Sequence, residues 1–130
     1  MFFYGLFMDE ELLRGKGIVP MSPRPASLDG FGLHIGKRAT LVPARHERSY
    51  GMVMGLTQQE LKELYSGPGL EHYRPEAVTC TTLAGELVSA LCYNLPNAPA
   101  PDEVNEKYAD QLRAVLAKLG FPAEYVERVR

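Results

Sequence analysis

The chain has 130 residues, of which 45% are hydrophobic and 23% charged, with a formal net charge of −2 and a pI near 5.9. This length and composition predict one globular domain over residues 1–130. The charge excludes the strongly basic balance of most nucleic-acid-binding proteins, and no apolar run approaches the roughly 20 residues of a membrane span. Because the first residues also lack the charged leader of a signal peptide, we expect a cytoplasmic protein.

A β-prone apolar run opens the chain and is interrupted at Gly5. A glycine between a strand and a helix permits a tight turn whose backbone N–H groups converge in a nest, which binds a carboxylate or acyl oxygen. We therefore expect the N–H groups of Gly5 and Leu6, with Phe7 as a further candidate, to face a cavity without a protein partner. Asp9 predicts the cap of the short helix that follows. The alternative is a buried first strand followed by an ordinary turn.

The middle of the chain is rich in proline and glycine, which predicts interrupted strands. The prolines before residue 26 favour an irregular, partly extended connection, and residues 26–35 a bent or bulged strand. Residues 39–42 predict a second short strand that Pro43 stops, and residues 50–56 a third. Thr57 and Glu60 then have the spacing of a capping box, which predicts a helix over residues 57–66.

Residues 78–83 and 87–93 have the clearest strand patterns, with Ala84 and Gly85 between them as a two-residue hairpin turn. This register would place Cys80 opposite Ser89 and put the two cysteines on opposite faces of the hairpin. We therefore expect both cysteines to be reduced packing residues. The three histidines have no ligand spacing to one another or to the cysteines, so neither a metal nor a cofactor is expected.

The C-terminal third predicts a proline-rich loop and two helices. Asp102 is the expected cap of a long helix, and Tyr108 lies on its apolar stripe as an expected core residue. Gly120 predicts the end of this helix, and Pro122 the start of a last short one. Taken together, the elements indicate an α+β fold, with a small mixed and bent β-sheet or barrel of five to six strands and flanking helices.

Several segments resemble, in order and spacing, the γ-glutamylcyclotransferase-like family of small single-domain proteins. Residues 2–6 resemble the family's opening strand with its Tyr-Gly signature. Residues 50–64 resemble its central strand and helix, residues 73–75 its next strand, and residues 119–125 its closing segment. The resemblance covers nearly the whole chain and implies a mixed barrel with a cavity beside the Tyr-Gly turn.

The resemblance also implies a chemistry, in which the substrate's α-amine attacks its own γ-glutamyl carbonyl and releases 5-oxoproline with an amine or amino acid. Backbone N–H groups at the turn position the glutamyl group, and a glutamate moves the proton from the ammonium. The implied partner is a γ-glutamyl-like small molecule, with no nucleic acid and no membrane. The implied binding residues are Tyr4, Gly5, Leu6, Phe7, Tyr73 and Tyr125.

The sequence departs from the family pattern at two positions. Leu6 stands where the enzymes usually have a hydroxyl residue, and Pro68 stands where they have the glutamate. Glu71 is the nearest substitute for this base, and as a base it should be partly buried, with a pKa that desolvation raises. Three hypotheses remain: an enzyme that uses Glu71, a non-catalytic module that keeps the cavity for binding or regulation, and a structural domain that retains only the fold.

Overall fold

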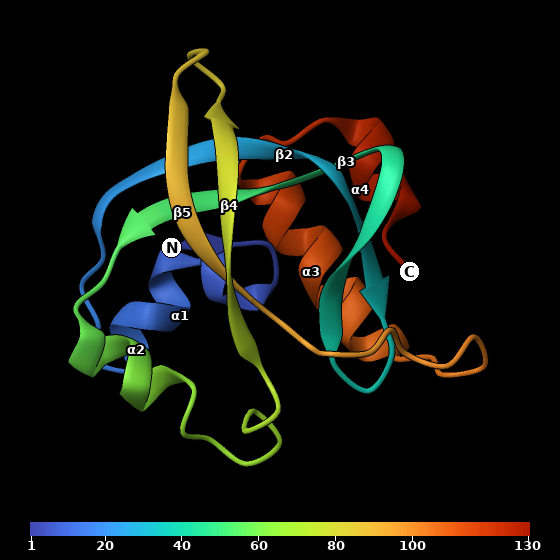
Figure 1. The fold of residues 1–130 in the computed structure, drawn as a ribbon, viewed down its shortest axis with the longest axis horizontal. Coiled ribbons are helices and arrows are strands. Elements are labelled where there is room, and N and C mark those ends of the chain that lie inside the picture. The colour runs from blue at the N-terminus through green and yellow to red at the C-terminus, as the bar shows by residue number, and fades with distance from the viewer.

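Five antiparallel strands form one sheet in the order β1–β3–β2–β4–β5 in the computed structural model, which describes residues 1–130 (Figure 1). The two edge strands, β1 and β5, also contact each other, so the strongly bent sheet comes close to closing into a barrel. The predicted α+β class with a bent sheet is confirmed. The strands are β1 Phe2–Phe3, β2 Met21–Ile35, β3 Ala39–Gly55, β4 Arg74–Thr82 and β5 Leu87–Asn94.

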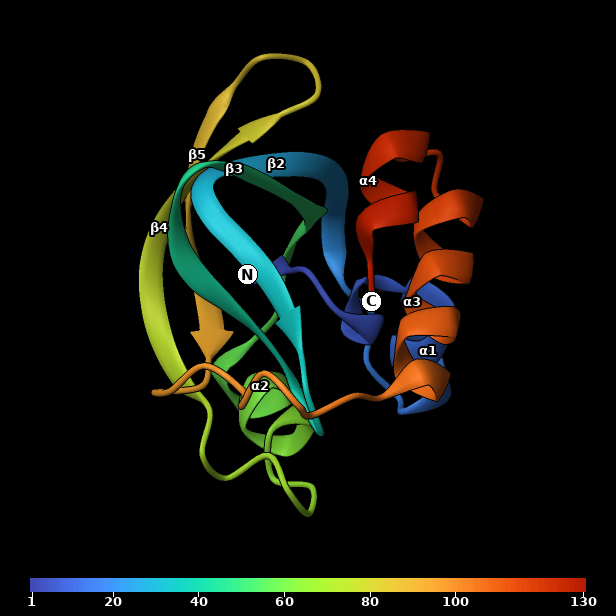
Figure 2. The same ribbon diagram turned by 90° about the vertical axis from the view of Figure 1, so that its right-hand side faces the viewer.

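Helices α1, α3 and α4 gather on one side of the curved sheet, and α2 lies at one end of it (Figure 2). Side chains from both layers are fully buried between them, among them Phe2 and Met54 from the sheet and Leu112 and Leu116 from α3. None of the helices has both the length and the hydropathy to cross a bilayer. The helices are α1 Glu10–Gly15, α2 Gln58–Leu64, α3 Glu106–Lys118 and α4 Ala123–Arg128, with a 3₁₀ helix over Leu6–Met8.

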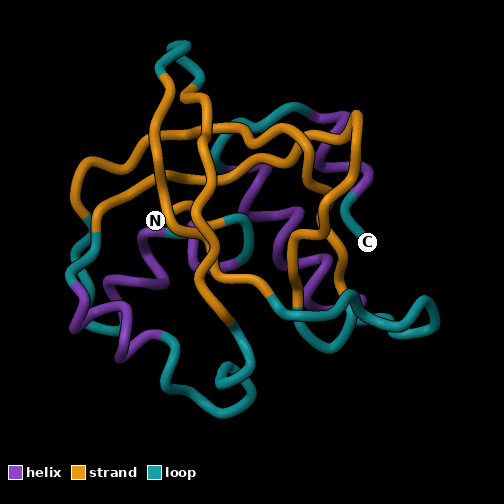
Figure 3. Tube along the Cα trace, in the orientation of Figure 1, coloured by secondary structure: helices purple, strands orange, loops and turns teal.

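Strands β2 and β3 are longer than the sequence predicts, and they form the spine of the sheet (Figure 3). Pro43 does not end β3. It pairs with Phe31, whereas the next pair joins Asp29 to Arg48, so residues 44–47 of β3 stand opposite Gly30 alone. This four-residue bulge begins directly after the proline, which donates no ladder hydrogen bond, and both strands bend there.

The hairpin of β4 and β5 has a three-residue loop, where the sequence predicts a two-residue turn. The N–H of Thr82 donates to the carbonyl oxygen of Glu86 at 2.8 Å, and Gly85 within the loop has φ +93°. Such a loop, with a left-handed glycine as its last residue, is the next commonest hairpin after the two-residue types. The extra loop residue shifts the register by one, so Cys80 lies opposite Val88.

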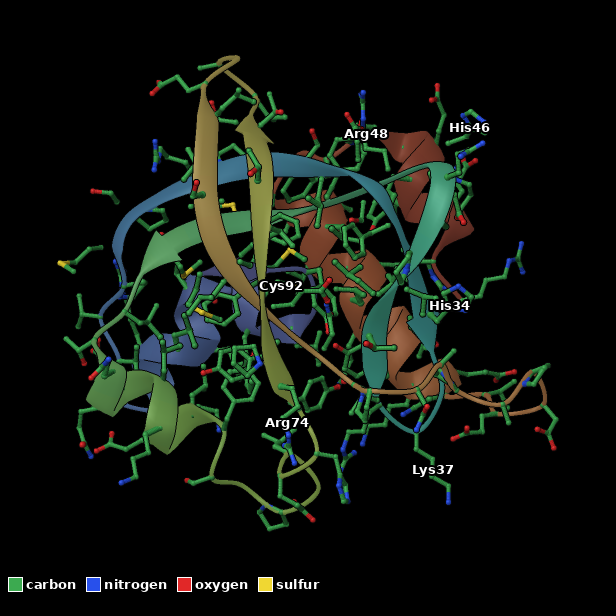
Figure 4. The ribbon with its side chains drawn as sticks, viewed as in Figure 1. His34, Lys37, His46, Arg48, Arg74 and Cys92 are labelled. Carbon is green, nitrogen blue, oxygen red and sulfur yellow. The ribbon has the colours of Figure 1, made fainter.

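A one-residue shift reverses the face on which side chains lie, so the prediction that the two cysteines face opposite ways is wrong. Cys92 lies opposite Glu76, which puts Cys80 and Cys92 on the same, core-facing side of the hairpin. Both thiols are free and fully buried, and Figure 4 shows Cys92 inside the fold. Burial raises the pKa of Cys80 to about 11 and that of Cys92 to about 12.

Helix α3 begins later than predicted, with Asn105 in place of Asp102 as its N-cap. The side chain of Asn105 accepts the backbone N–H of Tyr108 at 3.1 Å, as a cap does for a donor of the first turn. The predicted end of this helix at Gly120 is confirmed by the left-handed φ of +82° at that residue. Pro122 precedes α4 as predicted.

Candidate functional site: a cavity beside the Gly5 turn

A cavity of about 400 Å³ lies between the turn at residues 4–7 and the loop that follows α2. The sequence predicts this juxtaposition. Helix α1, the β2–β3 turn and the first turn of α3 complete the walls. The lining residues are Phe2, Phe3, Tyr4, Gly5, Leu6, Phe7, Leu12, Lys16, Lys37, Arg38, Ala39, Tyr65, Pro68, Leu70, Tyr73, Asn105 and Tyr108.

The expected nest of backbone donors is present in part. The N–H of Gly5 has no protein acceptor, as predicted. The N–H of Leu6 is not free, because it donates to the phenolic oxygen of Tyr108 at 3.3 Å. Gly5 has φ −108°, which any residue can adopt, and glycine is needed there for space, since a Cβ would overlap the Tyr108 hydroxyl. The turn therefore offers the free N–H of Gly5 beside a phenol.

An aromatic wall closes one side of the cavity. The rings of Tyr65 and Tyr93 stack with their centroids 4.2 Å apart and an interplanar angle of 14°. Phe7 meets Tyr65 edge to face at 5.7 Å, and Tyr73 lies against Tyr65 at 5.9 Å. Such packing holds the rings in one arrangement and gives the cavity a rigid apolar surface.

Two phenols of the cavity donate their protons to backbone carbonyl oxygens. Tyr4 donates to the carbonyl oxygen of Tyr93 at 2.7 Å, and Tyr73 donates to that of Ala39. Burial raises the pKa of both phenols well above the ordinary value. Both therefore stay protonated at neutral pH, so neither serves as a base there.

The charged groups of the cavity wall are all cations. They are Lys16 from the end of α1 and Lys37 and Arg38 from the β2–β3 turn. Figure 4 shows Lys37 at the end of the molecule where the loop after α2 runs, away from the bulge at His46. No aspartate, glutamate or histidine lines the cavity. Its electrostatics therefore favour an anionic ligand.

Glu71 does not occupy the position that the enzyme hypothesis requires. Its side chain is exposed and does not line the cavity. Hydrogen bonds from the backbone at Glu71 and Gly69, together with the nearby charges of His72 and Arg38, lower its pKa. The expectation of a partly buried carboxyl with a raised pKa is wrong, because the loop turns Glu71 towards solvent.

Five of the six predicted binding residues line the cavity, and the sixth, Tyr125, does not. The five are Tyr4, Gly5, Leu6, Phe7 and Tyr73, and Pro68 lines the cavity beside them. Tyr125 packs on Tyr50, with their ring centroids 5.0 Å apart. It borders a separate hollow of about 60 Å³ next to the β3 bulge and the end of α4. Its expected place beside the Gly5 turn is wrong, because α4 packs near the bulge of the sheet, away from that turn.

Comparison with known proteins identifies the family. The sequence matches the model of the family described as gamma-glutamyl cyclotransferase, AIG2-like, over residues 1–112. The chain belongs to this family. No curated protein matches the sequence.

Solved structures agree in fold with this gamma-glutamyl cyclotransferase, AIG2-like chain. A gamma-glutamyl cyclotransferase superposes with a TM-score of 0.78 at 20% identity, covering 98% of this chain and 83% of that one. An uncharacterized protein from Homo sapiens has a TM-score of 0.76 at 22% identity, with the same coverages of 98% and 83%. YkqA from Bacillus subtilis has a TM-score of 0.78 at 21% identity, covering 98% of this chain and 51% of that one. At these identities the likeness shows the fold.

Most of the lining residues were not predicted as site residues from the sequence, among them the cations and the tyrosines Tyr65 and Tyr108. Tyr108 was assigned to the core of the C-terminal helix, whereas it is half-buried and lines the cavity. Lys37 and Arg38 come from the turn between β2 and β3, and Tyr65 follows the last residue of α2. The sequence contained one signal that Tyr108 is more than a core residue. Its hydroxyl requires a polar partner when the side chain is buried, and the apolar stripe of the helix offers none.

Proposed function

We propose that this chain is a non-catalytic member of its family that binds a γ-glutamyl-like small molecule in the cavity beside Gly5. The cavity of about 400 Å³ is large enough for a compound of this size. The free N–H of Gly5 offers a donor for a carbonyl or carboxylate oxygen. Lys16, Lys37 and Arg38 complement the carboxylates of such a ligand.

The observation that carries the proposal is that no carboxylate lines the cavity, with Pro68 in its wall. Cyclisation requires a base, because the attacking α-amine is protonated at neutral pH. Pro68 stands where the family resemblance expects the glutamate, and proline has no group that moves a proton. Glu71 is exposed, with a lowered pKa, so it supplies no base in the cavity. Binding without turnover is therefore the function that fits these residues, and a cytoplasmic location remains part of the proposal.

Two measurements on the same samples test the proposal. Isothermal titration calorimetry with γ-glutamyl-alanine should give saturable binding, and the release of 5-oxoproline from it should not exceed that of a protein-free blank. Alanyl-alanine, which lacks the γ-glutamyl group, is the control ligand and should bind at least about tenfold more weakly. Release of 5-oxoproline by the unmodified protein would overturn the non-catalytic assignment. Failure to bind γ-glutamyl-alanine would overturn the ligand class.

A further inference from the structure

The three cations of the cavity wall have no acidic partner in the protein. None of Lys16, Lys37 and Arg38 takes part in an ion pair. Glu103, which lies near Lys37, spends both of its carboxylate oxygens on backbone N–H groups, and Glu71 is exposed. Neither of these glutamates lines the cavity. The wall therefore carries positive charge that the protein itself does not neutralise.

The same wall offers few free hydrogen-bond acceptors. The guanidinium of Arg38 approaches the carbonyl oxygens of Lys37 at 3.4 Å and of Pro68 at 3.5 Å. The carbonyl oxygen of Ala39 accepts the phenol of Tyr73. Backbone N–H groups also bind the carbonyl oxygens of three further lining residues, Gly5, Leu6 and Leu70. The cavity is thus rich in donors and poor in acceptors.

A γ-glutamyl compound carries one group that does not suit such a wall, its α-ammonium. At neutral pH this amine is protonated, so it has three N–H donors and no acceptor. A charged group leaves water for a partly enclosed site at a high cost unless an opposite charge or hydrogen-bond acceptors receive it. In this cavity the ammonium would meet cations and carbonyl oxygens that are already in use. The carboxylate and carbonyl oxygens of the same compound are acceptors and do suit the wall.

We infer that the cavity prefers ligands whose γ-glutamyl group lacks the α-ammonium, such as glutaryl amides, and that Lys37 and Arg38 are the specificity residues for this preference. The inference rests on the proposed function and narrows its ligand class. Arg38 acts in two ways, because its charge repels an ammonium and its N–H groups occupy carbonyl oxygens that the ammonium would need. A glutaryl amide also has no amine that could attack its carbonyl, so its binding requires no base.

The first arm of the test varies the ligand. Calorimetry at neutral pH should compare γ-glutamyl-alanine with glutaryl-alanine, in which a hydrogen atom replaces the α-amine. The unmodified protein should bind glutaryl-alanine about tenfold more tightly, because this ligand leaves no buried charge without a partner. The size-matched control is the analogue with a hydroxyl in place of the amine. It is neutral at that position and should also bind more tightly than γ-glutamyl-alanine.

The second arm varies the protein. Arg38→Gln should weaken binding of glutaryl-alanine more than that of γ-glutamyl-alanine, so the preference should fall from about tenfold to about threefold or less. Lys37→Gln removes a charge and leaves the bonds of Arg38 to the loop after α2 in place, and it should reduce the preference about twofold. It decides the question if Arg38→Gln fails to fold. Arg45→Gln is the matched control, because Arg45 is exposed in the β3 bulge outside the cavity, and it should keep the full preference.

The possible outcomes separate this inference from the proposed function. Equal affinities, or tighter binding of γ-glutamyl-alanine, would overturn the inference and leave the proposed function intact. A full preference in both Lys37→Gln and Arg38→Gln would overturn the assignment of these two residues. Binding of glutaryl-alanine alone would support the inference and replace the γ-glutamyl class by its amine-free form. If the protein bound none of the three compounds, the proposed function itself would fail.

Discussion

The guanidinium of Arg38 binds the loop after α2, since its Nε donates to the carbonyl oxygen of Gly69 at 3.2 Å. Its Nη2 also approaches the carbonyl oxygen of Pro68 at 3.5 Å. Gly69 has φ +83° and no room for a Cβ beside this guanidinium. The cation therefore lies beside Pro68, so a carboxylate introduced at this position would have a lowered pKa and be a weaker base.

This relationship predicts the result of restoring the glutamate. Pro68→Glu should release 5-oxoproline from γ-glutamyl-alanine slowly. A second change, Arg38→Gln, should raise the rate at saturating ligand about tenfold, because it removes the cation that lowers the pKa of the new carboxyl, although it should also weaken binding of the ligand. Pro68→Gln is the control, similar in shape but unable to act as a base, and it should stay inactive. If Pro68→Glu were as inactive as Pro68→Gln, the ligand would not bind with its amine near residue 68.

Gly5→Ala should destabilise the protein and impair binding. The new methyl group would overlap the Tyr108 hydroxyl, and relief of such overpacking costs roughly 1–3 kcal/mol. Gly15→Ala, at the exposed end of α1 with open space around it, is the control and should leave stability unchanged or raise it by up to about 1 kcal/mol. Urea unfolding of both variants measures the difference. A Gly5→Ala protein as stable as Gly15→Ala would show that Tyr108 is not fixed against the turn.

The cations at the cavity predict that the affinity for γ-glutamyl-alanine depends on salt. Raising the ionic strength from 0.05 M to 0.5 M should weaken binding, because added salt screens the attraction of Lys16, Lys37 and Arg38 for the carboxylates. Lys37→Gln should reduce the affinity about two- to fivefold at low salt and less at high salt. Lys62→Gln, on an exposed face of α2 outside the cavity, should change neither. Equal effects of the two substitutions would remove Lys37 from the site.

The buried thiols predict a loss of stability in alkali. Burial raises the pKa of Cys92 from 9.0 to about 12, so the unfolded chain releases this proton at lower pH than the folded protein does. The protonated Cys92 thiol makes its full contribution to the free energy of unfolding below pH 9. This contribution is lost as the pH rises towards 12, at about 1.4 kcal/mol per pH unit in between. The free energy of unfolding should therefore fall less steeply over this range in Cys92→Ala than in the unmodified protein. Parallel slopes for the two proteins would show that the Cys92 thiol ionises equally in both states.

Features that depend on a few neighbouring residues followed from the sequence. Thr57 and Glu60 form the predicted capping box, with the Thr57 N–H 2.9 Å from a Glu60 carboxylate oxygen. Asp9 caps α1 as predicted, through its bond to the N–H of Glu11. The turn at Gly5 with the unpaired N–H of that residue also followed from the sequence, whereas the predicted free N–H of Leu6 did not. In each case the interacting groups lie within four residues of one another, so their types and spacing decide the outcome.

The hairpin and the cavity wall depended on tertiary structure. The hairpin loop has one more residue than expected, and this reversed the face of Cys80, because side chains alternate between the two faces of a strand. Local turn preferences do not fix the number of loop residues. Tyr108 meets the Gly5 turn across 102 residues, and Arg38 meets Gly69 across 31. Glu71 faces solvent, and α4 carries Tyr125 to a different hollow. The sequence by itself determined the turn at Gly5 and the caps of α1 and α2. The packing of α3 and the β2–β3 turn around the cavity decided its remaining donors and charges. Contacts between segments so far apart are set by how whole elements pack, which no local pattern of residues encodes.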